Sequence, residues 1–395
     1  MLKLVLLILG VLITASVQQI TVPLFVSIYP SIYFLSVIIT VECLVLYTVA
    51  LTILNYISNK KLNSAPKCTK KCTTLADPTI ISKLPLVSLV GVSNAAMSMC
   101  FLYSANPIRT PILIQTIFLG LAILPSVLFT KVILNKNNKY EKKYCIPSII
   151  FMVISICLAI IPFVQYNINF SAWILMYLGG VILMSLTNIL QEKYTNETKG
   201  DNEKFIDKIR LAFYSRIFHT IFILCMCWMD IVFGYNDDGI AGAVNAFIES
   251  FNIYIGDLYY FFIIQVFVFS YFLLFIIAMY LNEISTNYNM VTTGLSNQSV
   301  TIFFTIFPHL NHGIKYPIFV VILNLYCNIA SIFLWVKGET DESDMPSGSE
   351  KIKLRMYAPL TQCNTNHHHT DHTNCTHDQE HHHEHQTYKT FDSPV

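Results

Sequence analysis

The sequence predicts an all-α polytopic membrane protein with ten transmembrane helices, arranged as two inverted five-helix repeats. First, 54% of the 395 residues are hydrophobic and only 12% are charged, with a mean hydropathy of +0.54, whereas charged residues make up about a quarter of an ordinary soluble domain. Second, the chain contains ten apolar runs, each of about 20 residues, the length needed to cross a hydrocarbon core. Third, two spans that carry polar residues fall in corresponding halves of the chain.

The ten runs divide into two sets of five. They cover residues 4–21, 31–56, 84–103, 110–130 and 146–164, then 171–190, 211–233, 258–281, 289–308 and 316–336. We therefore expect one membrane domain over residues 1–337, with repeats of about 1–165 and 170–337. The first run has a second interpretation, because Lys3 followed by an apolar stretch and by small residues at 15 and 16 also fits a cleaved signal peptide.

The fourth run places prolines and polar side chains inside an apolar stretch, YSANPIRTPILIQTIFLGLAILPSVLF at 103–129. Four of its residues fall within about 60° of one another on a helix: Pro111, Gln115, Ala122 and Ser126. Such a face is tolerated where protein or water satisfies it. In the ninth run, polar residues recur at every fourth position: Thr293, Asn297 and Thr301. Related polar spans in corresponding halves are typical of transporters built from repeats.

Basic residues in short loops predict the orientation of the chain. Lysine and arginine gather in residues 57–83, 131–145 and 191–210, whereas the connection 234–257 has four acidic residues and no basic one. We expect the basic loops and both termini in the cytosol. Within the acidic connection, residues 241–254 have apolar positions at near-helical spacing, which fits either a surface helix or a solvated connector that packs on the spans.

The composition changes after Lys337. Residues 338–395 are polar, acidic and rich in helix breakers, so we expect a disordered cytosolic tail. Its histidine tract offers ligands for transition metals: His367, His368, His369, His381, His382 and His383. Because the tract has no fixed geometry, the prediction is weak, promiscuous chelation. Cys68 and Cys72 are a weaker zinc candidate, since no second ligand pair lies nearby.

Six polar residues at membrane depth are candidates for a substrate or proton pathway: Glu42, Asn94, Gln115, Asn188, Asn297 and Gln298. A carboxylate near the middle of a span costs about 2.5–3.5 kcal/mol on insertion scales. Glu42 is therefore interpreted as a proton-responsive or cation-binding group facing a central cavity, or as a hydrogen-bonded residue holding helices together. The amides either line a cavity or join helices.

Three basic residues in the spans are interpreted first as snorkelling side chains: Arg109, Arg216 and His219. The alternatives are a guard at a cavity mouth for the first and a proton relay for the other two.

Several function classes lack their motifs. The absence of a GxxxxGK[ST] loop argues against an ATP-driven pump, and no HExxH motif accompanies the spans. The net charge of +1 gives no indication of nucleic-acid binding. We expect no enzymatic activity and no cofactor. Secondary transport of a small-molecule solute across the lipid bilayer is the class that remains.

The chain resembles the drug/metabolite transporter superfamily, and within it the chloroquine-resistance-transporter-like branch, over residues 2–337. The resemblance rests on the five-plus-five plan, ANPIRTPILIQTIFLGLAILPSVLF at 105–129, SLTNILQEKY at 185–194 and NYNMVTTGLSNQSVTI at 287–302. Two features depart from the branch, because the connection 234–257 has no cysteine and the histidine tract is not part of the pattern.

The resemblance implies inverted repeats around a central cavity. The implied solutes are peptides, amino-acid derivatives, thiols or organic cations, carried across an internal or plasma membrane, with proton coupling as one option. A vacuolar or other endomembrane is favoured over the plasma membrane. Nucleotide-sugar transporters share the fold and are the nearest alternative, and a metal-ion transporter is a weaker one.

Overall fold

The computed structural model describes residues 2–63, 82–135, 139–140, 142–165, 171–198, 205–234, 239–284, 286–308 and 317–340. Within them the chain is helical, apart from a two-residue antiparallel pair, β1 (Lys139–Tyr140) with β2 (Glu339–Thr340). The last helix includes Gly338 and β2 follows it, so described secondary structure extends past the predicted start of the tail. The histidine tract, Cys68 and Cys72 lie outside the described residues.

Each of the ten apolar runs is mostly helical over its described residues, which confirms the all-α prediction. The helices are α1 (Leu2–Ile28), α2 (Ile32–Asn63), α4 (Leu84–Ser104), α5 (Ile112–Gly120), α6 (Ile123–Ile133), α7 (Lys142–Gln165), α8 (Ala172–Thr198), α9 (Phe205–Cys225), α10 (Met229–Phe233), α11 (Gly239–Gly256), α12 (Leu258–Ile284), α13 (Thr286–Ile306) and α14 (Ile318–Gly338). The fourth run contains both α5 and α6, and the seventh contains α10 and most of α9.

The helices expose apolar side chains and bury polar ones, as expected where lipid replaces water. On α14, Phe319 and Phe333 are exposed, whereas Asn324 and Ser331 on the opposite face are buried. Among the described residues, seven segments are long and apolar enough to cross a membrane: α1, α2, α4, α5 with α6, α8, α12 and α14. The chain is a polytopic integral membrane protein.

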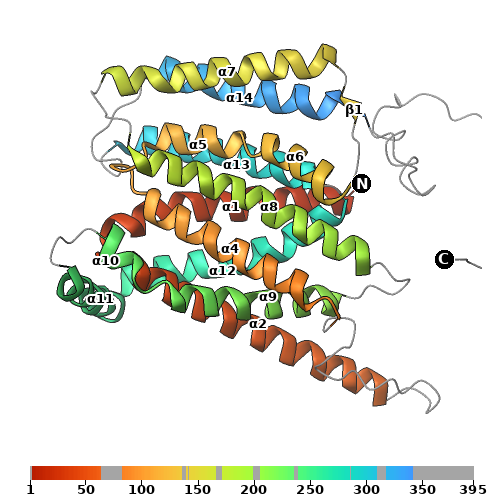
Figure 1. Cartoon of the computed structure of the whole chain (residues 1–395), viewed down its shortest axis with the longest axis vertical. Coiled ribbons are helices and arrows are strands. Elements are labelled where there is room, and N and C mark those ends of the chain that lie inside the picture. Colours follow the sequence, from red (N-terminus) through yellow and green to blue (C-terminus); the bar gives the residue numbers. More distant parts are fainter. Residues whose placement is uncertain are drawn as a thin grey trace, which may run out of the picture. The chain divides into compact units, whose positions relative to one another are not determined.

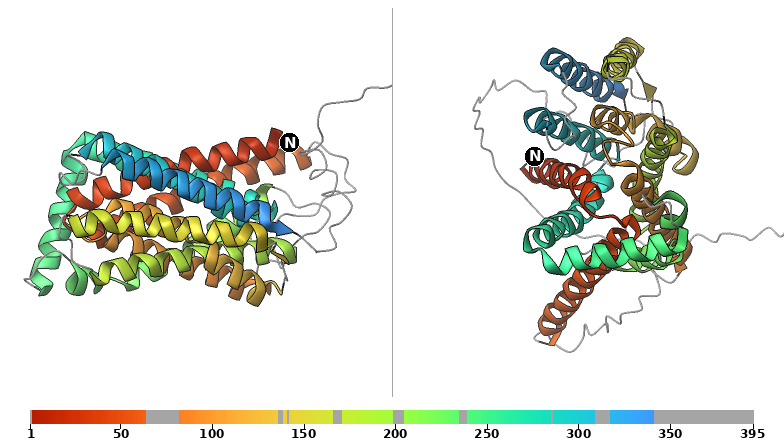
Figure 2. Two further views of the ribbon diagram at one scale, coloured as in Figure 1. Left: turned by 90° about the horizontal axis from the view of Figure 1, so that it is seen from above. Right: turned by 90° about the vertical axis from the view of Figure 1, so that its left-hand side faces the viewer.

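Successive long helices run in alternate directions between two ends of the bundle (Figure 1). Helix α11 lies across one end, which we call the α11 end (Figure 2). The start of α1 and the finish of α14 both lie at the opposite end, as the two figures agree. The long helices therefore return the described chain to the end from which it started.

The fourth apolar run is broken between α5 and α6, near its middle. Pro125 has no N–H, and its ring clashes with the carbonyl four residues earlier, that of Leu121. This carbonyl accepts the N–H of Leu124 instead (3.0 Å), and a turn at residues 121–122 separates the helices. The predicted polar face is consequently divided, with Gln115 on α5 and Ser126 on α6, both buried.

Residues 241–254 lie within helix α11, as the surface-helix interpretation requires, and this helix packs on α2 and α12, as the connector interpretation requires. Its buried face consists of small residues: Gly242, Ala246 and Ser250. The Ser250 hydroxyl accepts the N–H of Ser31 (2.9 Å) and so joins α11 to the turn between α1 and α2. Its exposed apolar residues recur at near-helical spacing: Ile240, Val244, Ile248, Phe251 and Ile255. A helix with such a face fits the surface plane of a bilayer.

Candidate functional site

A central cavity of about 190 Å³ lies among eight helices. Side chains of α1, α2, α4 and α5 line it from the first half of the chain, and side chains of α8, α9, α12 and α13 line it from the second. The lining combines aromatic rings, such as Phe101 and Phe267, with amides, such as Gln18 and Gln191. It can therefore hold a solute that has both apolar and polar parts.

Three of the six predicted pathway residues line this cavity: Asn94, Gln115 and Asn188. Asn94 accepts a hydrogen bond from the Tyr271 hydroxyl on α12 (3.1 Å). Gln115 donates to the carbonyls of Ala105 (2.8 Å) and Thr110 (2.6 Å). Gln115 thus also stabilises the turn that leads into α5.

Asn188 joins three helices beside the cavity. Its Oδ1 atom on α8 accepts hydrogen bonds from Asn282 of α12 (3.1 Å) and from Asn289 of α13 (3.2 Å). Asn282 also donates to Gln191 Oε1 (2.9 Å). This amide network connects lining residues with residues that lie behind them.

Glu42 does not line the cavity, contrary to the expectation from its depth in the span. Tyr254 on α11 donates a short hydrogen bond to its carboxylate, and Gln265 on α12 donates another (2.8 Å). Burial, followed by the hydrogen bond and charge of Glu42, raises the pKa of Tyr254, so the neutral phenol acts as the donor. The carboxylate lies on the side of α2 that faces α11, because that helix supplies its partner. The hydrogen-bonded alternative, in which Glu42 holds helices together, describes this geometry.

Asn297 and Gln298 on α13 also lie outside the cavity lining. Both side chains are buried, and within the described part of the chain their buried amide atoms have no hydrogen-bond partner. The polar content of the ninth run predicted their burial but not the surface that they face.

Arg216 and His219, interpreted first as snorkelling residues, line the cavity from α9. Arg216 is only 2% exposed, and neither Nη1 nor Nη2 has a hydrogen-bond partner among the described residues. Its guanidinium carbon lies 4.7 Å from the ring centre of Tyr271 and 6.0 Å from those of Tyr47 and Phe275. Snorkelling is therefore wrong for both residues. His219 follows Arg216 by three residues and Ile223 follows it by seven, so the sequence itself indicates that the three share one face of α9.

The cavity carries an unbalanced positive charge. None of its described lining residues is an aspartate or a glutamate, and Arg216 is the one lysine or arginine among them. The Nδ1 atom of His219 is buried and likewise has no partner in the described structure. The arrangement can accept an anionic group from outside the protein.

Arg109, the third basic residue, neither snorkels nor lines the cavity. It donates to the carbonyls of Tyr103 (2.8 Å) and Phe233 (2.8 Å), and its guanidinium lies 3.8 Å from the ring centre of Trp173. It therefore joins the ends of α4, α10 and α8.

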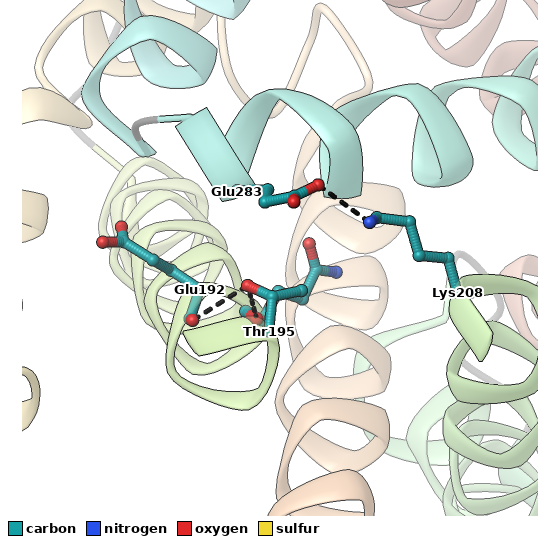
Figure 3. Close-up of polar contacts among 5 residues, drawn as sticks. Glu192, Thr195, Lys208 and Glu283 are labelled. Atoms are coloured by element: carbon teal, nitrogen blue, oxygen red, sulfur yellow. Dashed lines mark hydrogen bonds and ion pairs between the residues drawn. The ribbon is translucent and has the colours of Figure 1, made fainter. Parts of the chain in front are cut away.

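At the end opposite α11, polar contacts join α8, α9, α12 and α13. Lys208 and Glu283 form an ion pair at 2.8 Å, and Thr195 donates to the Glu192 carbonyl (2.9 Å) within α8 (Figure 3). The Thr286 hydroxyl donates a short hydrogen bond to the Glu192 carboxylate. These contacts link helices that also line the cavity.

Comparison with protein-family models and with curated proteins finds no match for this chain. The resemblance to drug/metabolite transporters therefore remains a prediction from the motifs.

Proposed function

We propose that the chain is a secondary transporter of small organic solutes, built from two inverted five-helix repeats over residues 1–337. The observation that carries the proposal is the origin of the cavity lining. Four helices of each half contribute, whereas α7 and α14, the fifth helix of each half, contribute no described lining residue. Secondary transporters bind their substrates at such an interface between repeats.

The helix pairs that pack together support the repeats. Let α1, α2, α4, the α5–α6 pair and α7 correspond in order to α8, α9, α12, α13 and α14. Helix α4 then packs on α8 as α12 packs on α1, and α4 packs on α9 as α12 packs on α2. The pairing of α1 with α13 has its counterpart in α8 with α6. Three further contacts map onto themselves: α2 with α9, α5 with α13 and α7 with α14.

The contacts between α7 and α14 support the same correspondence in atomic detail. Ser148 of α7 donates to the Ser331 carbonyl of α14 (2.7 Å), and Asn324 of α14 donates to the Ser155 carbonyl of α7 (3.0 Å). The two positions are seven residues apart on each helix. Exchanging the helices therefore exchanges one contact for the other, as a two-fold axis would require.

The solutes proposed are those that the resemblance implies: peptides, amino-acid derivatives, thiols or organic cations. A nucleotide-sugar transporter is the second candidate, because the unpaired guanidinium of Arg216 would suit phosphates. For a metal-ion transporter the described residues offer little, since no three His, Cys, Asp or Glu side chains in them gather into a possible metal site.

We further propose that both termini are cytosolic, because the basic loops follow the positive-inside rule. A vacuolar or other endomembrane is the proposed location, on the resemblance alone.

The direct test is uptake by proteoliposomes that contain the purified full chain. The panel holds peptides, thiols, organic cations, organic anions and nucleotide sugars, with and without a pH gradient. Uptake of at least one class above protein-free liposomes, saturating with concentration, is the expected result. Uptake equal to that of protein-free liposomes for every class would refute the proposal.

A further inference from the structure

Building on the proposed transport function, we infer that the transported solute is a small organic anion and that Arg216 binds its carboxylate or phosphate group in the central cavity. The inference would exclude organic cations, which the resemblance had left open.

The first step is the state of Arg216. A buried cation is ordinarily paired with an anion, because an uncompensated charge inside a protein is strongly unfavourable. Arg216 is buried to 2% exposure, and the polar groups beside its guanidinium are the hydroxyls of Tyr271 and Tyr47. Neither terminal nitrogen meets a partner at hydrogen-bond geometry, and no carboxylate forms an ion pair with it within the described residues. The missing partner must come from outside this part of the chain, and the cavity gives it access.

The second step is the geometry around the guanidinium. The rings of Tyr271, Tyr47 and Phe275 lie 4.7–6.0 Å from its central carbon. Aromatic faces stabilise a cation, and the Tyr271 and Tyr47 hydroxyls add polar contacts, but none of these groups is a carboxylate that would occupy the planar fork. The donors of the planar fork stay available for a carboxylate or phosphate, which arginine binds through two parallel hydrogen bonds.

The third step is the remainder of the lining. His219, one turn beyond Arg216, offers an unpartnered Nδ1 atom, and Asn188 and Gln191 add neutral polar groups from α8. The described lining has no acidic side chain to balance a cationic solute, and the positive charge of Arg216 repels one. The volume of about 190 Å³ is below the roughly 300–1,000 Å³ of pockets for drug-sized ligands. A solute the size of an amino-acid derivative fits better than a nucleotide sugar.

The experiment uses the full chain in proteoliposomes at pH 6.5, with leucine-derived probes of different charge. They are anionic N-acetyl-leucine, neutral N-acetyl-leucinamide and cationic leucinamide. Glycerol 3-phosphate forms a separate arm that distinguishes phosphate from carboxylate.

We expect uptake of at least one anionic probe to exceed that of the neutral and cationic probes by tenfold or more. Arg216→Gln should remove at least nine-tenths of this uptake. Arg216→Lys should keep the preference for anions with weaker apparent affinity, because it keeps the charge but not the fork.

The matched control is Arg210→Gln, which removes a buried arginine from the same helix at a position outside the cavity lining. This variant should keep the anion preference. A second readout does not depend on the solute, since removal of an uncompensated buried charge should raise the Tm of the solute-free protein. We expect Arg216→Gln and Arg216→Met to unfold at a higher temperature than wild type.

Each outcome bears on a different statement. Equal uptake of neutral or cationic probes by wild type, or unchanged anion preference in Arg216→Gln, would overturn the inference and leave transport intact. A lower Tm in both Arg216 variants would show that the residue is structural and would also overturn it. Failure to take up these probes and every solute of the wider panel would instead refute the proposed function.

Discussion

At the scale of single residues, Asp230 shows how hydrogen bonds from several elements satisfy a carboxylate buried inside the bundle. It is 6% exposed. Its oxygens accept hydrogen bonds from the hydroxyls of Ser31 (2.5 Å) and Tyr103 (2.5 Å) and from the N–H of Tyr33 (3.1 Å). These donors belong to the α1–α2 turn, α4 and α2, so Asp230 fixes four elements at the α11 end.

We predict that Asp230→Asn lowers stability by about 2–3 kcal/mol, because the amide nitrogen cannot accept a hydrogen bond and charge-assisted bonds are lost. Thermal unfolding of the purified protein in detergent measures this. Asp257→Asn is the matched control, since Asp257 is exposed and accepts the N–H of Tyr259 (2.9 Å), a role that asparagine also fills. Equal Tm values for the two variants would contradict the assigned role of Asp230.

For Glu42 the structure gives a different expectation from depth alone. We predict that Glu42→Gln changes stability by only about 1 kcal/mol, because the amide oxygen can still accept from Tyr254 and Gln265. Transport should keep its dependence on a pH gradient, if it has one, since the carboxylate does not line the cavity. Initial uptake against pH tests this, and loss of the dependence in Glu42→Gln would return Glu42 to the proton pathway.

The position of a polar residue along its apolar run thus predicted that it lies inside the bundle, but not which neighbour its side chain faces. Asn94, Gln115 and Asn188 reach the cavity, whereas Glu42 faces α11. The direction depends on the rotation of each helix about its axis, which is fixed by packing against distant segments. Arg216 was interpreted first as a snorkelling residue for the same reason, because the sequence does not show whether its side chain turns to the interface or to the cavity, which it lines.

At the scale of elements, the position of α9 depends on Gly91. A Cβ atom added at this residue of α4 would lie 2.3 Å from the Ser215 carbonyl oxygen and 2.8 Å from Phe218 Cβ. The nearest obstacle is backbone, which cannot rotate aside. The two helices therefore pack as closely as they do only because residue 91 has no side chain.

We predict that Gly91→Ala destabilises the protein by about 1–3 kcal/mol through overpacking and reduces uptake, because the displaced segment carries Arg216 and His219. Gly179→Ala on α8 is the matched control. A Cβ atom there would meet nothing within 4 Å, so better helix propensity should stabilise it by about 0.5–1 kcal/mol. Tm and uptake are measured for both variants, and the prediction fails if Gly91→Ala behaves like Gly179→Ala.

The existence of the helices was predictable because apolar runs of membrane length have few other structures available. The break between α5 and α6 was not predicted, since prolines in spans are tolerated when neighbouring groups re-satisfy the backbone. Its position follows from Pro125, through the carbonyl of Leu121. Helix α11 was one of two open interpretations, because its small buried face becomes evident only against the bundle end.

At the scale of the whole molecule, the number of membrane crossings decides the relation between the termini. Seven described segments meet the length and hydropathy expected of a span. Three further helices, α7, α9 and α13, run along the bundle, and each is opposite in direction to the helices that come before and after it among those that run along the bundle (Figure 1). If these three also cross, the number of crossings is even and the termini share one side.

We predict that tags at both termini are cytosolic, and that a tag inserted between Gly234 and Gly239, at the α11 end, lies on the other side. Protease added to intact endomembrane vesicles with the cytosolic face outward should remove both terminal tags and spare the inserted one. We expect α9 and α13 to cross as well, because they contribute lining to a cavity that they share with six candidate spans. Protection of one terminal tag would indicate an odd number of crossings. Helices α7 and α14 are hydrogen-bonded to each other at two levels, so both should cross the bilayer if one does. An odd number of crossings would therefore remove the basis for the proposed two-fold axis between them.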